Sequence, residues 1–182
     1  MRELSLHILD IVQNSISAGA GLVQIDVIEN AQADSMTIRV TDDGSGMDPE
    51  TARRIVDPFV TSRITRPVGL GVPLFAAAAE RCGGGLGIDS SCGAGATVTA
   101  VFGLSHIDRA PLGNMADTFR VLAVCNPNVD FVYNHVRGER SFHVDTREIR
   151  AALGDVPLSL PEVALFIRDF IAEGERGLGG SA

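Results

Sequence analysis

Lysine and tryptophan are absent from the 182 residues, and only one tyrosine and three cysteines occur. All 15 basic side chains are therefore arginine, which excludes chemistry that needs a lysine amine, such as a Schiff base or a P-loop. The cysteines, Cys82, Cys92 and Cys125, are odd in number and lack Cys-x-x-Cys spacing. This pattern favours reduced thiols over a disulfide framework or a zinc site.

Long apolar runs and an excess of positive charge are also missing. No stretch approaches the roughly 20 apolar residues that a membrane-spanning helix needs, and the N-terminal residues do not form the apolar run of a secretory signal. The net charge of −8 argues against binding to DNA or RNA through neutralisation of phosphates. We therefore expect a cytoplasmic protein that binds neither a membrane nor nucleic acid.

The pattern of apolar residues changes character at about residue 104. Before it, helical and strand periodicities predict a helix, two strands, two helices and two strands, at about 4–18, 23–27, 36–40, 49–56, 72–82, 86–90 and 97–102. After it, Pro111 and Gly113 mark a linker to a helix, a hairpin and two further helices. We expect residues 1–104 to form the main domain and residues 105–182 an α+β extension that provides a dimer surface, a partner site or extra cover for the sheet.

Two polar residues on the first predicted helix, Asp10 and Asn14, are four positions apart and project toward one point. The amide oxygen of an asparagine can bind a hydrated Mg²⁺ shared with phosphate oxygens, and a carboxylate one turn earlier can take a proton from a water. His7 falls on the same polar face. A solvated helix face is the alternative interpretation of this spacing taken alone.

Asp42 ends the second predicted strand directly before a glycine turn that contains Gly44 and Gly46. A carboxylate there is costly to bury unless it finds donors, and the amino group of adenine is one. The glycines would let the backbone approach a flat base closely. A plain Asp-Gly turn is an equally good interpretation of this segment in isolation.

A second glycine motif, Gly69-Leu70-Gly71, precedes a predicted helix whose free N–H groups can hold phosphates. Farther along, Thr97 offers a hydroxyl at the beginning of a strand. Its alternative interpretation is an ordinary β-branched strand residue.

In this order the motifs resemble the nucleotide site of the Bergerat-fold ATPases, the superfamily of gyrase, heat-shock chaperones, histidine kinases and MutL. The segments that carry the resemblance lie within residues 3–102. They are the N box in its MutL-like form (Asp10–Ala20), the G1 box (Asp42–Met47), the Phe-containing box of histidine kinases (Asp57–Arg63), the G2 box (Gly69–Gly71) and the last nucleotide box (Gly95–Thr97).

The resemblance implies an α/β two-layer sandwich, with a mixed, mainly antiparallel sheet covered on one face by helices, and a site for ATP and Mg²⁺. It implies that Asn14 coordinates Mg²⁺, that Asp42 binds the adenine amino group and that Asp10 occupies the general-base position. The other residues that it assigns to the nucleotide pocket are Gly44, Gly46, Met47, Arg63, Gly69, Leu70, Gly71 and Thr97.

Three positions depart from the family pattern. Asp10 stands where the base is usually Glu, or Asn in many histidine kinases, so the resemblance supports binding more strongly than catalysis. Asp43 replaces the usual Asn and is expected to add negative charge near the ribose. The lid between Arg63 and Gly69 is very short, which leaves phosphate neutralisation to Arg63 and Arg66.

The predicted function is that of a regulatory protein whose histidine-kinase-like or anti-sigma-kinase-like domain acts as a kinase or ATPase on a partner protein. The alternative is a nucleotide-gated protein-binding module with little or no hydrolysis. The segments Arg2–Asp10 and Asp145–Arg150 also resemble small ATP-binding proteins found with iron-hydrogenase subunits in anaerobic bacteria. This implies a hydrogenase-related partner, and a homodimer is a further expectation.

Overall fold

The structure is a computed structural model that describes residues 3–56 and 70–179. Its helices and strands follow the predicted order, and the ends of the seven elements before residue 104 lie within three residues of the predicted ones. They are α1 (Leu4–Ser17), β1 (Leu22–Asn30), β2 (Ser35–Asp42), α2 (Pro49–Val56), α3 (Gly71–Arg81), β3 (Gly85–Ser90), β4 (Ala96–Gly103), α4 (Met115–Cys125), β5 (Asp130–Arg137), β6 (Arg140–Asp145), α5 (Thr146–Leu153) and α6 (Pro161–Gly177).

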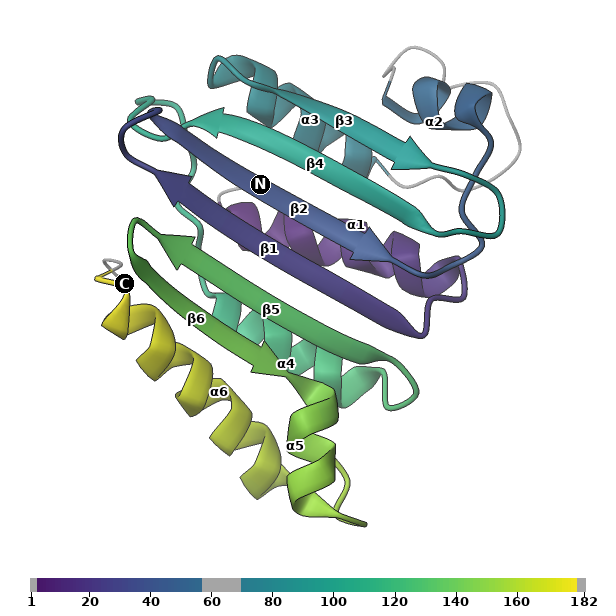
Figure 1. Cartoon of the computed structure of the whole chain (residues 1–182), viewed down its shortest axis with the longest axis vertical. Helices are drawn as coiled ribbons and strands as arrows, with labels where there is room; N and C mark the ends of the chain where they lie inside the picture. The colour runs from purple at the N-terminus through teal and green to yellow at the C-terminus, as the bar shows by residue number, and fades with distance from the viewer. Residues whose placement is uncertain (1–2, 57–69, 180–182) are drawn as a thin grey trace.

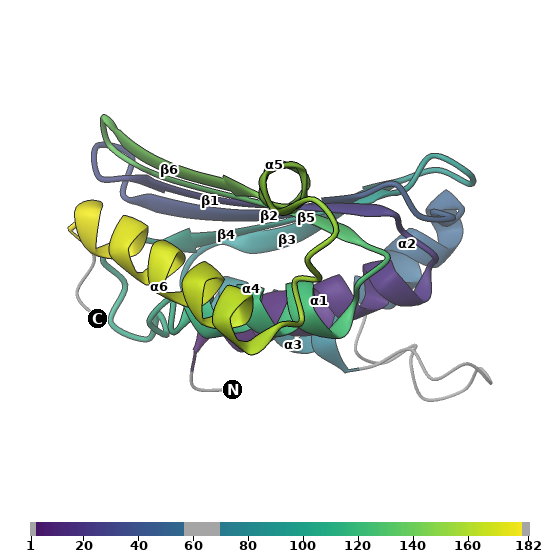
Figure 2. The same cartoon turned by 90° about the horizontal axis from the view of Figure 1, so that it is seen from below.

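The strands form a six-stranded sheet in the order β3-β4-β2-β1-β5-β6 (Figure 1). Only the β1–β5 pair is parallel within this sheet, and its other four pairs are antiparallel. Helices α1, α3, α4 and α6 lie on one face of the sheet, whereas α5 directly follows β6 at its end (Figure 2). The predicted two-layer α/β sandwich with a mixed, mainly antiparallel sheet is thereby confirmed.

Alternation along the central strands creates the face on which the helices pack. In β2 the buried residues are Met36, Ile38 and Val40, while the residues between them point to the helix-free face. The buried residues of β1 and β4 follow the same rule, and in β5 Val132 is buried as well as Phe131, Tyr133 and His135. Strands β1, β2 and β4 therefore contribute every second side chain to a core shared with the helices.

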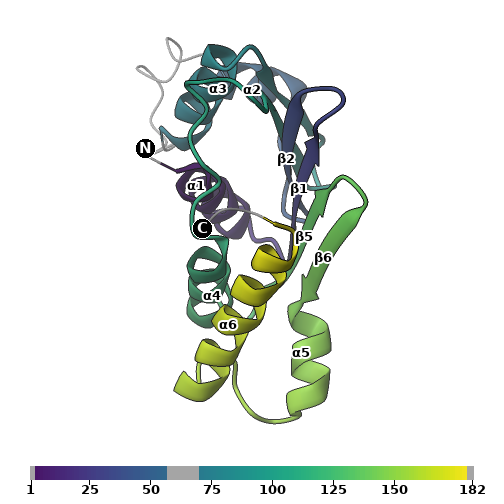
Figure 3. The ribbon, with the colours of Figure 1, turned by 90° about the vertical axis from the view of Figure 1, so that its left-hand side faces the viewer.

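The sheet continues across the predicted boundary at residue 104. Strand β5 pairs along the whole of β1, from Leu22 opposite Asp130 to Glu29 opposite Arg137, and β6 pairs with β5. Helices α4 and α6 lie side by side over this part of the sheet (Figure 3). The extension therefore adds two strands and helical cover to the sheet, and its independence as a domain stays a prediction.

His7 is an exception to the predicted polar face of α1. Its side chain is 4% exposed and stacks on Phe75 of α3, with 5.2 Å between the ring centroids. The prediction that it lies on a polar face is wrong because α3 packs against this flank of α1. Burial lowers the pKa of His7 below its usual value, so that the neutral imidazole is favoured there.

Candidate functional site

The amino end of α3 lies against the middle of α1. Gly71 contacts Asp10, and Phe75 contacts His7, so the two helices run in opposite directions. A Cβ atom at Gly71 would stand 2.8 Å from the Cβ of Asp10, a distance that packed atoms do not tolerate. Glycine at this position therefore permits the approach, and the free N–H groups at the start of α3 lie beside the polar side chains of α1.

A pocket of about 280 Å³ occupies this junction and is lined by Asp10, Gln13, Asn14, Leu70, Gly71 and Leu74. The structure thus brings together four residues that the sequence predicted for one site. Gln13 and Leu74 were not predicted, although Gln13 could have been found as a neighbour of Asn14 on the exposed side of the helix. The described lining residues carry no positive charge, and what they offer to an anion is the helix N–H groups at the start of α3.

Asp42 ends β2 on the helix side of the sheet, and its carboxylate is held from two directions. Ser15 Oγ donates a hydrogen bond of 2.6 Å to Oδ2, and the Gly44 backbone N–H donates one of 2.9 Å to Oδ1. Ser15 was not predicted as a site residue. A signal was present, because Ser15 is a small polar residue on the side of α1 that otherwise carries the core residues Ile11 and Val12.

The turn after Asp42 is fixed between α1 and the β3–β4 turn. Ser45 N donates to Ala18 O at 2.9 Å, and Met47 N donates to Ser90 Oγ at 2.9 Å. Gly46 has a φ of +62°, and a Cβ there would overlap carbonyl oxygens of the β3–β4 turn. The predicted glycine turn is thus a tightly packed junction of three segments.

Asp43 is turned away from Asp42 and holds the start of β1. Its Oδ1 accepts hydrogen bonds from the backbone N–H groups of Gly21 at 2.7 Å and Leu22 at 2.9 Å. Gly21 O in turn accepts from Asp130 N at 2.9 Å, at the start of β5. The extra negative charge of Asp43 is therefore engaged by backbone donors, and the same residues join the glycine turn to the C-terminal hairpin.

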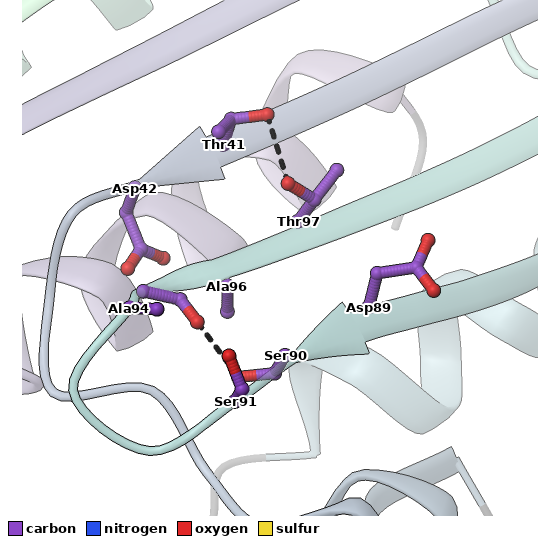
Figure 4. Close-up of a pocket in the computed structure, with 9 residues that line it drawn as sticks. Thr41, Asp42, Asp89, Ser90, Ser91, Ala94, Ala96 and Thr97 are labelled. Carbon is purple, nitrogen blue, oxygen red and sulfur yellow. Dashed lines mark hydrogen bonds between the residues drawn. The ribbon is translucent and has the colours of Figure 1, made fainter.

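Thr97 lies near Asp42 but its hydroxyl is turned elsewhere. Asp42 is paired across the strands with Ala96, and Thr97 is paired with Thr41. The Oγ1 atoms of Thr97 and Thr41 are 3.2 Å apart (Figure 4). Alternation places these hydroxyls on the helix-free face, whereas Asp42 and Ala96 point to the helix face.

A shallow hollow of about 360 Å³ lies over the ends of β2, β3 and β4. It is bordered by Thr41, Asp42, Asp89, Ser90, Ser91, Ala94, Gly95, Ala96 and Thr97 (Figure 4). This hollow and the pocket at Asn14 share no lining residue. Asn14 and Asp42 are instead linked through Ser15, which follows Asn14 in the chain and bonds to Asp42.

Two predicted site residues, Arg63 and Gly69, lie outside the described residues, as does the predicted Phe-containing box.

In the described part of the chain, no helix is both long enough and apolar enough to cross a membrane.

Comparisons with known proteins bear on the family and the fold of this chain. The family described as histidine kinase-, DNA gyrase B- and HSP90-like ATPase matches residues 2–106. The chain is 40% identical over 58 residues to the sensor protein kinase FleS of Pseudomonas aeruginosa, a match that covers 32% of this chain and 14% of FleS. It is 30% identical over 109 residues to a putative sensor protein of Shewanella frigidimarina, covering 59% of this chain and 17% of that protein.

The chain therefore spans less than a fifth of the length of these two relatives. A solved structure described as the N-terminal domain of a DNA repair protein shares the fold, with a TM-score of 0.54 and 15% sequence identity. That likeness covers 79% of this chain and 52% of the other.

Proposed function

The chain belongs to the family of histidine kinase-, DNA gyrase B- and HSP90-like ATPases, and we propose that it binds Mg-ATP between α1 and α3 and transfers the γ-phosphoryl group to water or to a partner protein. The observation that carries this proposal is the close contact between Gly71, at the amino end of α3, and Asp10 on α1. It brings a carboxylate, the Asn14 amide and free helix N–H groups to one pocket.

The groups in this pocket fit a triphosphate with magnesium. Asn14 provides a neutral amide oxygen that can bind Mg²⁺ when phosphate oxygens and water complete its shell, and the Asp10 carboxylate one turn earlier is left free to accept a proton. Asn14 is exposed toward the pocket, and Asp10 is half-buried beside Gly71. When bound, the metal would neutralise phosphate charge, which matters here because the described lining residues include no cation.

The base of the nucleotide is assigned to the Asp42 side of the site. An ionised carboxylate only accepts hydrogen bonds, so it suits an amino group such as that of adenine. Gly44 and Gly46 let the turn pack closely against α1 and the β3–β4 turn. In this proposal Ser15 connects the two ends of the site, because it bonds to Asp42 and follows Asn14.

Asp10 is the proposed general base. It would accept the proton of the attacking water or of an acceptor side chain, while the bond between the γ-phosphorus and the bridging oxygen breaks and ADP leaves. Aspartate is one methylene shorter than the glutamate usual in the family, and the absence of a Cβ at Gly71 lets α3 come correspondingly close to it.

The test is an incubation with γ-labelled ATP and Mg²⁺, alone and with a candidate partner protein, in which both free phosphate and labelled protein are followed. Free phosphate that is lost in Asp10→Asn and retained in Gln13→Ala would identify an ATPase, since Gln13 lines the same pocket without an assigned role. Label on protein would identify a kinase. Failure of the wild-type chain to bind Mg-ATP would contradict the proposal.

A nucleotide-gated binding module is the second candidate, and one contact favours it. The backbone of Gly21 accepts from Asp130 on β5 and donates to Asp43 in the glycine turn. A change in the turn on nucleotide binding would therefore act directly on the C-terminal hairpin, where a hydrogenase-related partner or a second copy could dock. Tight binding of Mg-ATP with neither free phosphate nor labelled protein is the outcome that selects this candidate.

A further inference from the structure

The side-chain hydroxyl that touches Asp42 comes from α1. Ser15 is 4% exposed, and its Oγ lies 2.6 Å from Asp42 Oδ2. The other acceptor near this hydroxyl is the carbonyl oxygen of Ile11 at 3.5 Å, which is too long for a strong bond. The hydroxyl hydrogen is therefore committed to the carboxylate.

The second carboxylate oxygen is fixed by the backbone. Gly44 N donates to Asp42 Oδ1 at 2.9 Å, and Gly44 is so enclosed that a Cβ there would lie 3.1 Å from Ala18 O. Each oxygen of a carboxylate has a second lone pair. Asp42 is thus held by two donors and still has acceptor capacity on both oxygens.

The neighbouring strand β4 offers the Asp42 carboxylate no hydroxyl group. The residue paired with Asp42 on β4 is Ala96, and Thr97 beside it bonds to Thr41 on the other face. Within residues 3–56 and 70–179, Ser15 makes the one side-chain hydrogen bond to the Asp42 carboxylate.

We propose that Ser15 is a positioning residue that sets the preference of this site for a base with an exocyclic amino group, by holding the Asp42 carboxylate in the orientation that accepts from it. This inference rests on the proposed function. The final torsion of an aspartate is broad, so an unanchored carboxylate must be ordered when the base binds. A carboxylate that Ser15 already holds avoids that cost.

The test is calorimetric titration with two ligands, Mg-ATP and the Mg complex of purine riboside triphosphate, which lacks the amino group. We expect Ser15→Ala to weaken ATP about tenfold, the effect of one hydrogen bond to a charged group, and to change purine riboside triphosphate less than about twofold. Ser17→Ala is the matched control, because Ser17 Oγ bonds to Gln13 O on the exposed side of the same helix, and it should change neither affinity.

A double variant at positions 15 and 42 tests whether Ser15 acts through Asp42. If Ser15 acts through Asp42, Ser15→Ala should cause no further loss of ATP affinity in an Asp42→Ala background. Equal weakening of both ligands by Ser15→Ala, or an additive loss in the double variant, would overturn the inference while leaving the nucleotide site intact. A wild-type chain that binds neither ligand would overturn the proposed function as well.

Folding of the variant is checked independently by its thermal unfolding. Should Ser15→Ala not fold, Ser15→Cys keeps a similar volume with a weaker donor. It should lose part of the preference for ATP over purine riboside triphosphate, and an unchanged preference would count against the inference.

Discussion

Two groups of polar side chains lie on the helix side of the same sheet, and they differ in what they leave unsatisfied. At the Asp42 end, Ser15 and a backbone N–H hold one carboxylate, which keeps acceptor capacity beside a pocket. At the other end of β1, His135 lies between Glu29 on β1 and Glu175 on α6. There the imidazole and the two carboxylates pair with one another and join α6 to the sheet.

The His135 cluster has short contacts on both ring nitrogens. Nδ1 is 2.9 Å from Glu175 Oε1, and Nε2 is 3.2 Å from Glu29 Oε1. Tyr133 donates to the same Glu175 at 2.7 Å. Burial disfavours the charged imidazole, but hydrogen bonds to Glu175 and Glu29 outweigh it and raise the pKa of His135 to about 9. The cluster is thus a charged contact that ties α6 to the centre of the sheet.

The comparison shows that hydrogen-bonded carboxylates have different roles at the two ends of β1. The half-buried Asp42 carboxylate, with one donor on each oxygen, can still accept from a ligand. The carboxylates of Glu29 and Glu175 instead share one buried cation and hold helix and sheet together. If this is right, changes in one cluster leave the other's function unaltered.

The largest expected effect is on stability. Replacing His135 with Ala leaves Glu29 and Glu175 without their shared cation and should lower the free energy of unfolding by about 3 kcal/mol. His143→Ala is the control, because His143 is exposed and bonds to Asn134 on the helix-free face; it should cost less than about 1 kcal/mol. Denaturant unfolding measures both. The affinity of folded His135→Ala for Mg-ATP should stay within about twofold, and a larger loss would show that the two clusters are coupled.

The second expected effect, the change in the free energy of unfolding with pH, should be somewhat smaller than the effect of removing His135. The folded pKa of His135 is about 9, above the ordinary 6.5, so its contribution is complete below pH 6.5 and disappears as the pH rises through 9. The free energy of unfolding should fall by about 2–3 kcal/mol over this range. At the acid end, the hydrogen bond from His135 lowers the pKa of Glu29, so that its contribution is present above its ordinary pKa and is lost as the pH falls below it.

His135→Ala should flatten the alkaline slope, and urea unfolding at several pH values compares the two proteins. An unchanged slope in the variant would assign the pH dependence to other groups.

At the nucleotide end, the expected effect is on binding. Gly71→Ala would place a methyl group against the Cβ of Asp10, and the overpacking should cost about 2 kcal/mol of Mg-ATP binding, or about 30-fold in affinity. Gly85→Ala is the matched control, since nothing lies within 4 Å of a Cβ there. Fluorescence titration compares the two. Unaltered affinity in Gly71→Ala would mean that the α1–α3 contact is not part of the site.

The sequence predicted the part of the site that local geometry determines. Asp10 and Asn14 share a helix face because of their spacing, and Gly71 falls at the start of α3 because a glycine motif precedes the helical pattern. The helices and strands followed from their periodicities for the same reason. These features depend on neighbours within a few residues.

Features that depend on register or on distant segments could not be read in this way. The direction of Thr97 follows from its pairing with Thr41, and a shift of one residue would reverse it. The bond between Ser15 and Asp42 joins residues 27 positions apart. The contact between His135 and Glu175 on α6 joins residues 40 positions apart, which no local pattern indicates.

The central claim is that Asn14 serves the metal-bound phosphates while Asp42 serves the base. Its most direct test is the affinity of Asn14→Ala for Mg-ATP and for adenosine, measured side by side with the wild-type chain by saturation-transfer NMR and titration. We predict a loss of at least about tenfold for Mg-ATP, as expected when a metal ligand is removed, and a change below about twofold for adenosine. Losses of equal size for the two ligands would contradict the assignment.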